Sequence, residues 1–325
     1  MRVALDPAAI ERFSVDLSKL FDVADGTLLV AVSGGPDSVA LLLLAHELLG
    51  TRCRAATVDH GLRAEAASEA AWVASLCGTL GIAHATLSAP MPERAGRTRN
   101  LSSRARALRY DLLGAHAAAI GATAIATAHH TDDQVETLVM RLNRGAGLTG
   151  LSGVRARSGA VIRPLLGWRR AELAALVNAA GITPVDDPSN RDGQFDRARV
   201  RASLTDATWI APASWSRSAQ ALNDAEDALD WATEQLWRER CRVGEDGLVF
   251  TPTDLPFDLQ RRLIARCVRA VEPLADPRGG AVVAAVTSLA RGDCVTLGNV
   301  LCRATRGACD ETVWRFVRAP VRRSR

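Results

Sequence analysis

One short segment constrains the fold of this chain more than any other. Residues 28–44 read LLVAVSGGPDSVALLLL, so an apolar run is followed by a small polar loop and a Leu-rich run. Residues 28–32 have the length and composition of a buried parallel strand, and residues 39–49 are long enough to form a helix on the same sheet. A strand, a glycine turn and a helix N-terminus together predict a binding site for an anion such as phosphate.

An aspartate, Asp37, lies inside this predicted phosphate loop. Its carboxylate would repel phosphate unless a cation lay between them, and Mg²⁺ prefers one or two carboxylates together with phosphate oxygens. Proline in the loop has a preset φ that suits the first turn of the helix. The segment therefore predicts a nucleotide bound with Mg²⁺ on Asp37, held by Ser33, Gly34, Gly35, Pro36, Asp37 and Ser38.

Two other nucleotide-binding loops are excluded by the sequence. A P-loop needs a lysine after its glycines, and the only lysine of the chain is Lys19. A G-x-G-x-x-G pattern does occur at residues 145–150, but it follows a helical pattern at 134–143 and not a strand. We interpret it as a glycine-rich loop and not as a dinucleotide site.

Strand and helix patterns alternate over the first half of the chain. After the first strand and helix, short strands are predicted at 54–58, 82–87 and 122–128, and helices at 64–80, 101–119 and from 132. This alternation predicts a doubly wound, Rossmann-like parallel sheet. We predict a catalytic domain over residues 1–213 and a smaller α+β domain over residues 214–325, which begins with a long helix.

Composition limits the class of protein. The 325 residues are 48% hydrophobic, carry a net charge of +4 and contain seven scattered cysteines. No apolar run is long enough for a membrane span and no signal peptide is evident, so we expect a cytoplasmic protein with free thiols and no membrane partner. The mild basicity is compatible with nucleic acid but does not imply it. A homodimer is left open.

Acidic residues follow two predicted strands. Asp59 and His60 end the second strand, where a ribose or base contact and an ordinary turn are equally good interpretations. The stretch HHTDDQVE places Asp132, Asp133 and Glu136 at the start of a helix. Helix capping alone would explain them, but they also follow a strand end near Asp37, which favours contact with a metal or a substrate amine. The paired histidines lack further partners for zinc.

Two groups of arginines and three of the tryptophans are further candidates for functional residues. Arg106 and Arg109 lie on the predicted helix 101–119, where they are either solvated or bind phosphate. In the stretch FDRARVR, residues 195–201, alternate arginines favour an extended basic edge that reaches a phosphate or an RNA backbone. We interpret the tryptophans at 215, 231 and 237 as core residues and not as platforms for bases.

The motifs SGGPDS, VDHGLR, AR-x-x-RY, HHTDDQVET, LNRGAGLTGL, IRPLL and DDPSN occur in this order between residues 28 and 201. Together they resemble the tRNA(Ile)-lysidine synthetase family, within the PP-loop superfamily of N-type ATP pyrophosphatases. Two positions depart from the pattern: Ser102 stands where an acid is frequent, and Ala198 where an asparagine is usual. Both changes affect peripheral contacts and not the catalytic motifs.

The resemblance implies a fold of the adenine nucleotide alpha-hydrolase type and a carbon–nitrogen ligase, with the nucleotide-binding, catalytic domain at residues 1–213 and a domain that binds the tRNA substrate at residues 214–325. Such enzymes use ATP and Mg²⁺ to adenylate the C2 oxygen of the wobble cytidine in an isoleucine tRNA with a CAU anticodon. The amine of free lysine then displaces AMP, and the lysidine product switches decoding from AUG to AUA. The residues that the resemblance makes catalytic are Asp37, Arg106, Asp132, Asp133, Glu136 and Arg199.

Two alternative functions are weighed against this one. A tRNA thiolase of the same class would need a cysteine persulfide or a set of cluster-binding cysteines, and the chain has no C-x-x-C pair. A non-catalytic RNA-binding protein would need clustered basic and aromatic residues, yet aromatic residues make up only 4% of the chain. Both alternatives are therefore disfavoured.

Overall fold

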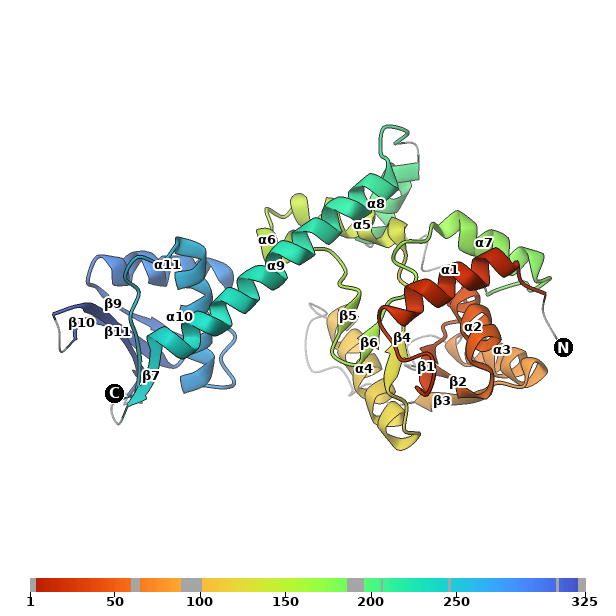
Figure 1. The fold of residues 1–325 in the computed structure, drawn as a ribbon, viewed down its shortest axis with the longest axis horizontal. Helices are drawn as coiled ribbons and strands as arrows, with labels where there is room; N and C mark the ends of the chain where they lie inside the picture. Colours follow the sequence, from red (N-terminus) through yellow and green to blue (C-terminus); the bar gives the residue numbers. More distant parts are fainter. Residues whose placement is uncertain are drawn as a thin grey trace. The chain divides into compact units, whose positions relative to one another are not determined.

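The computed structural model describes residues 4–59, 65–88, 101–185, 196–205, 207–244, 247–307 and 310–320 (Figure 1). The chain forms two compact units, Met1–Asn223 and Asp224–Arg325. The boundary lies within the long helix α9, Pro212–Arg240. The predicted division between residues 213 and 214 lies at the start of this helix and stays a prediction of where the functional domains separate. His60 and the DDPSN motif lie outside the described residues.

The first unit is built on a six-stranded sheet in the order β3-β2-β1-β4-β6-β5. Neighbouring strands are parallel except for the edge pair β5 and β6. The strands are β1 Leu28–Ala31, β2 Cys53–Asp59, β3 Ala83–Ser88, β4 Ala124–Ala126, β5 Arg157–Ser158 and β6 Val161–Ile162. The predicted doubly wound parallel sheet is confirmed. Its strand order reverses between β1 and β4, where ligands bind in folds of this kind.

Helices cover both faces of this sheet (Figure 1). One hydrophobic core joins β1 to α1, Pro7–Ser18, α2, Pro36–Leu49, α3, Glu65–Leu80, and α7, Arg170–Ala179. A smaller core joins the other face to α4, Leu101–Ala119. Helix α2 is buried on nearly all sides because its residues 38–45 all lie inside the core. This burial fixes the direction of its N-terminus, which follows the predicted phosphate loop.

Three further helices complete the first unit: α5, Thr131–Leu142, α6, Leu148–Leu151, and α8, Asp196–Thr205. Residues 145–147 of the G-x-G-x-x-G pattern form the turn between α5 and α6, as its interpretation as a loop predicts, whereas residues 148–150 belong to α6. Gln134 of α5 is buried and fixes the chain after this turn, since its side chain exchanges two hydrogen bonds of 2.8 and 2.7 Å with the backbone of Val154. Residues 196–201 are helical and not extended, so the predicted extended basic edge is wrong.

The second unit contains an antiparallel sheet in the order β7-β8-β11-β10-β9. Its strands are β7 Cys241–Gly244, β8 Gly247–Phe250, β9 Cys294–Leu297, β10 Val300–Arg306 and β11 Thr312–Arg318, and its helices are α10 Phe257–Val271 and α11 Gly279–Ala290. This confirms a smaller α+β part. Trp237 packs against its core, but Trp231 is 66% exposed, so the core interpretation is wrong for Trp231.

Among the residues that the structure describes, no helix is both long enough and apolar enough to cross a membrane.

Candidate active site

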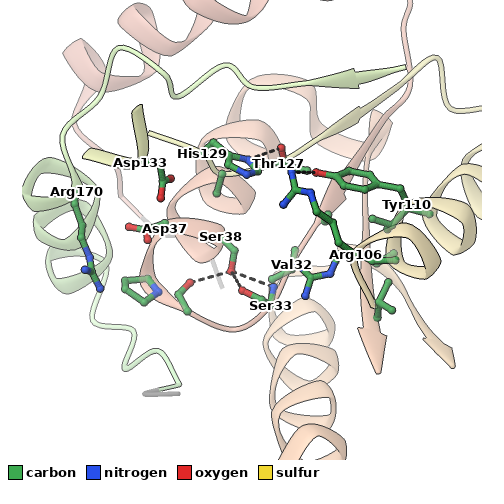
Figure 2. Close-up of a pocket in the computed structure, with 18 of the residues that line it drawn as sticks. Val32, Ser33, Asp37, Ser38, Arg106, Tyr110, Thr127, His129, Asp133 and Arg170 are labelled. Atoms are coloured by element: carbon green, nitrogen blue, oxygen red, sulfur yellow. Dashed lines mark hydrogen bonds between the residues drawn. The ribbon is translucent and has the colours of Figure 1, made fainter. Parts of the chain in front are cut away.

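A cavity of about 360 Å³ opens at the carboxyl ends of β1 and β4 (Figure 2). Its walls come from the loop before α2, from one side of α4 and from the segment between β4 and α5. Five arginines line it: Arg106, Arg109, Arg170, Arg197 and Arg201. Asp37 and Asp133 are its acidic lining residues among those described. A cavity rich in guanidinium groups is suited to a polyphosphate.

The loop at residues 33–38 has the geometry that its sequence predicts. Gly34 adopts a positive φ of 87°, which a side chain would disfavour. The Ser38 hydroxyl accepts a hydrogen bond from the Ser33 backbone N–H at 3.1 Å and donates one to the Gly35 carbonyl at 2.9 Å. Pro36 begins α2, and the loop therefore presents the N-terminus of a buried helix to the cavity.

A matched pair of substitutions tests this loop. Gly34→Ala is expected to lower the free energy of unfolding by about 1–2 kcal/mol, because a Cβ in the left-handed region is strained and would lie 3.1 Å from Val185 Cγ2. Gly35 has a φ of −70°, and a Cβ there meets nothing closer than 3.9 Å. Gly35→Ala should therefore cost less than about 1 kcal/mol. Urea unfolding compares the two, and equal losses would contradict the loop geometry.

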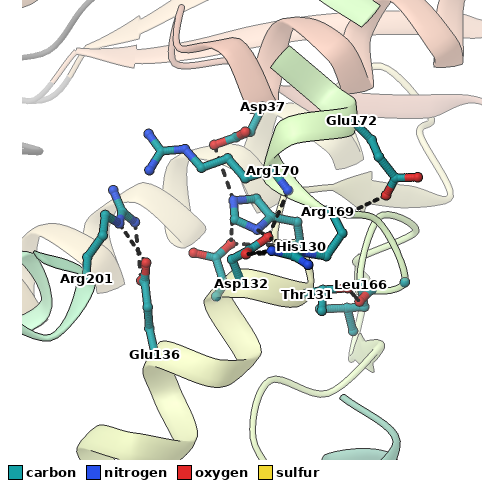
Figure 3. A network of polar contacts seen from close by, with 12 residues as sticks. Asp37, His130, Thr131, Asp132, Glu136, Leu166, Arg169, Arg170, Glu172 and Arg201 are labelled. Carbon is teal, nitrogen blue, oxygen red and sulfur yellow. Dashed lines mark hydrogen bonds and ion pairs between the residues drawn. The ribbon is translucent and has the colours of Figure 1, made fainter. Parts of the chain in front are cut away.

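Asp37 lies in the first turn of α2 and points toward the start of α5 (Figure 3). Its Oδ2 is 3.4 Å from Nε2 of His130. Its Oδ1 is buried and has no hydrogen-bond partner among the described residues. A buried carboxylate oxygen without a donor fits a hard cation such as Mg²⁺. Among the described residues, no group of three or more His, Cys, Asp or Glu side chains is arranged to hold a metal ion by itself.

Asp133 and Glu136 lie on one face of α5 and contact two arginines from α8, of which Arg197 bridges both acids and Arg201 contacts Glu136. Arg197 donates from Nη2 to Oδ1 of Asp133 and from Nε to Oε2 of Glu136, both at 2.6 Å. Arg201 donates from Nε to Oε1 of Glu136, also at 2.6 Å. Glu136 is only 3% exposed and does not line the cavity, whereas Asp133 does. The Glu136 carboxylate therefore fixes both arginines at the cavity wall.

Asp132 points in a different direction from Asp133. Arg169 donates to its carboxylate from Nη2 at 3.0 Å, and the backbone N–H of Arg170 donates at 2.8 Å (Figure 3). Its carboxylate thus lies at the N-terminus of α7, where the helix dipole favours an anion. Asp132 does not line the cavity, and its contacts join α5 to α7.

The capping interpretation of these acids is also realised. The backbone N–H of His130 donates to Oδ2 of Asp133 at 3.0 Å, which closes a capping box at the start of α5. Capping uses one carboxylate oxygen and leaves the other for Arg197. Helix capping and a place in the cavity are therefore compatible for Asp133.

The two histidines that precede α5 have opposite environments. Burial lowers the pKa of His129 to about 4, and its Nδ1 lies 3.0 Å from the Thr127 hydroxyl. Burial also opposes the charged form of His130, but its hydrogen bond to Asp37 and the nearby Asp133 and Asp132 carboxylates raise its pKa. His130 was not predicted as a site residue. The two histidines that directly precede two acids are the sequence signal that would have identified it as one.

The charges around Asp133 keep it ionised. Burial alone would raise the pKa of this carboxyl group, but the charges of His130 and Arg197 outweigh it and the pKa is lowered. Burial raises the pKa of Asp132 as well, and its contacts with Arg169 and Arg170 reverse the effect. Both aspartates are therefore anions at neutral pH, suited to binding a cation rather than accepting a proton.

The structure brings most of the predicted site residues together, but not all. Arg106 lines the cavity and donates from Nη2 to the Tyr110 hydroxyl at 3.2 Å. Asp59 ends β2 and is half-buried outside the cavity lining. Arg199 is exposed and lines a different groove. Reasoning from the sequence missed Arg170 as a cavity residue, whereas it predicted phosphate contacts for Arg197 and Arg201 but placed them on an extended edge.

Known proteins resemble this chain in sequence and in fold. The family model of the PP-loop domain matches residues 10–208. The chain is similar to the tRNA(Ile)-lysidine synthase of Novosphingobium aromaticivorans, with 46% identity over 97% of this chain and 95% of that one. It is also similar to the tRNA(Ile)-lysidine synthases of Zymomonas mobilis, with 38% identity over 92% of this chain and 90% of that one, and of Methylobacterium nodulans, with 39% identity over 95% and 96%.

Among solved structures, the U34-tRNA thiolase NcsA from Methanococcus maripaludis, which contains a 4Fe–4S cluster, matches with a TM-score of 0.54. The identity is 18%, and the match covers 66% of this chain and 78% of that one, so it shows a shared fold alone. The PP-loop domain carries the implication that ATP is bound. On the strength of the relatives that match along nearly its whole length, the chain belongs to the tRNA(Ile)-lysidine synthase family.

Proposed function

We propose that this protein joins free lysine to C2 of the wobble cytidine of an isoleucine tRNA with a CAU anticodon, at the expense of ATP. One observation supports this best: a helix-N-terminal loop and five arginines surround one cavity that also contains the carboxylates of Asp37 and Asp133. Groups suited to phosphate and groups suited to an amine thus lie side by side. The family membership supports the same reaction.

In the first step, the loop would bind the phosphates of ATP. The backbone N–H groups of Gly34, Gly35, Asp37 and Ser38 and the hydroxyl of Ser33 would contact a phosphate at the start of α2, and Arg106 would add a positive charge from α4. Asp37 would hold Mg²⁺, which when bound neutralises charge on the diphosphate leaving group. Asp59 and His60 stay predicted contacts of the ribose or base.

In the second step, Asp133 would bind the lysine amine. It is the acid of α5 that lines the cavity, and its lowered pKa keeps it ionised. Glu136 would act through Arg197 and Arg201, which it holds at the cavity wall. The chemical roles of Asp132 and Arg199 stay predictions, since neither side chain lines the cavity.

The cysteines favour lysine transfer over thiolation. Cys53 and Cys77 are buried in the hydrophobic core, where burial raises the pKa of the first to about 12 and that of the second to about 11. Such thiols are poor nucleophiles at neutral pH. No described cysteine lines the cavity. A thiolase would need a reactive sulfur there.

An assay of ATP products tests the proposal. The protein is incubated with ATP, Mg²⁺ and an isoleucine tRNA with a CAU anticodon, with and without lysine, and AMP and ADP are measured. We expect AMP and diphosphate, with repeated turnover only when lysine is present. Methionine tRNA, which has the same anticodon, serves as the control and should give far less AMP. Turnover that is independent of lysine would contradict the proposal.

A further inference from the structure

A second groove in the first unit has no role in the steps above. Its volume is about 670 Å³, and it lies between the last turns of α5, one side of α8 and the start of α9. We call it the tryptophan groove, because Trp209 and Trp215 both line it, packed against each other with ring centroids 6.1 Å apart and an interplanar angle of 58°. The other lining residues are Val139, Met140, Leu142, Asn143, Arg144, Arg199, Val200, Ser203 and Leu204.

The chemistry of this groove fits an unpaired nucleotide. Trp209 is 74% exposed and Leu142 is 54% exposed, so a large apolar surface faces solvent. Arg144 and Arg199 are exposed beside it, and none of the described lining residues is acidic. Exposed aromatic rings flanked by arginines, without carboxylates, form the pattern that binds single-stranded RNA, because rings stack on bases while guanidinium groups contact phosphates.

The groove shares both its principal helices with the cavity. On α5, Asp133 lines the cavity and Asn143 lines the groove, which places them about 15 Å apart along the helix at 1.5 Å per residue. On α8, Arg197 and Arg201 face the cavity while Arg199 lines the groove. At 3.4 Å per stacked nucleotide, this separation corresponds to about four nucleotides.

We propose that the tryptophan groove binds an unpaired base of the same tRNA whose wobble cytidine enters the cavity. The base stacks on Trp209, the more exposed ring, while Trp215, tilted by 58°, contacts its edge, and Arg144 and Arg199 contact the adjoining phosphates. This inference rests on the proposed function. It adds a contact that positions the anticodon strand, so that the target base is presented to the cavity with its neighbours already held.

Three variants test the inference in the full-length protein. Trp209→Ala is expected to weaken binding of the CAU isoleucine tRNA by about 5- to 100-fold, the usual effect of losing one stacked base, while the KM values for ATP and lysine stay unchanged. Trp209→Phe should recover most of the affinity because it keeps a ring. The matched control is Trp231→Ala. It removes an exposed tryptophan that lies on α9 and does not line the groove, and it should alter tRNA affinity by less than about twofold.

A salt titration provides a second, independent measurement. Arg144→Ala should reduce the slope of log affinity against log salt by about 0.7, the value for one phosphate contact with a single strand. An unchanged slope would overturn the proposed contact between Arg144 and a phosphate beside the stacked base.

The outcomes separate this inference from the proposed function. If the unsubstituted protein forms lysidine while Trp209→Ala binds tRNA as tightly as it does, the tryptophan groove is not an RNA site and the function stands. Equal losses of tRNA affinity in Trp209→Ala and Trp231→Ala would also overturn the assignment of RNA binding to the groove. If Trp209→Ala instead converts a dimer to a monomer in analytical ultracentrifugation without a change in tRNA affinity, the groove binds a second copy of the chain. A protein that forms no lysidine at all would refute the function itself.

Discussion

The Asp37→Asn protein is expected to form AMP from ATP on the order of 10³-fold more slowly than the unsubstituted protein. Asparagine has the same shape but lacks the negative charge that we propose holds Mg²⁺ at the buried Oδ1 position. Folding should be little affected, since the side chain is 26% exposed and its contact with His130 is 3.4 Å long. The rate is measured as AMP released from labelled ATP in the presence of the CAU isoleucine tRNA and lysine.

Glu47→Gln is the matched control for this substitution. Glu47 is an exposed acid on the same helix, beyond the buried turns, so the loss of its charge should change the rate by less than about twofold. ATP binding measured by calorimetry adds a second readout: added Mg²⁺ should strengthen binding to the unsubstituted protein and not to Asp37→Asn. AMP formation at the unsubstituted rate by Asp37→Asn would show that this carboxylate does not hold the metal.

The second large effect is expected at Asp133. Asp133→Asn should raise the lysine concentration needed for half-maximal transfer by roughly 10²- to 10³-fold, as when one partner of a buried charge pair is removed. Asparagine keeps an oxygen that accepts the His130 N–H, so the capping box of α5 survives. ATP activation should continue, and adenylated tRNA should accumulate. Mass spectrometry of the tRNA detects this intermediate, and steady-state kinetics give the dependence on lysine.

Asp132→Asn provides the comparison for this prediction. Its carboxylate lies on the neighbouring residue but contacts Arg169 and the start of α7 outside the cavity. Its effect on the lysine requirement should therefore be at least tenfold smaller than that of Asp133→Asn. If both variants lost ATP activation and lysine transfer in parallel, the acids would serve metal binding or folding, and the proposed division of roles would be wrong.

The strand, loop and helix at residues 28–49 were predictable because their determinants are local. Glycine, proline and apolar periodicity each favour one backbone conformation within a few residues. The convergence of acids with this loop was predictable because parallel strands end at the same edge of a sheet. The structure confirms that sheet, and it places Asp37 and Asp133 on one cavity.

The separation of Asp132 from Asp133 was not predictable from their spacing. Glu136 is four residues from one and three from the other, and both spacings place side chains on one face of a helix. Which of the two aspartates lines the cavity depends on their partners, Arg169 for Asp132 and Arg197 for Asp133, and both arginines come from distant segments of the chain. Such long-range pairings leave no signal in the local sequence.

The α8 arginines illustrate a wrong assumption about periodicity. Alternation at 197, 199 and 201 suits one edge of a strand, but in a helix the first and third lie on one face and the second lies elsewhere. Arg197 and Arg201 accordingly contact Glu136, while Arg199 lines the tryptophan groove. The low apolar content of this segment gave neither period an advantage.

Nucleoside analysis of the product RNA tests the central claim most directly. Unmodified isoleucine tRNA with a CAU anticodon is incubated with the protein, ATP, Mg²⁺ and isotope-labelled lysine, digested to nucleosides and analysed by mass spectrometry. We predict that the wobble cytidine is replaced by lysidine that carries the label, and that omission of ATP abolishes it. An unmodified cytidine, or a sulfur-containing nucleoside in its place, would contradict the assignment of lysine transfer to this cavity.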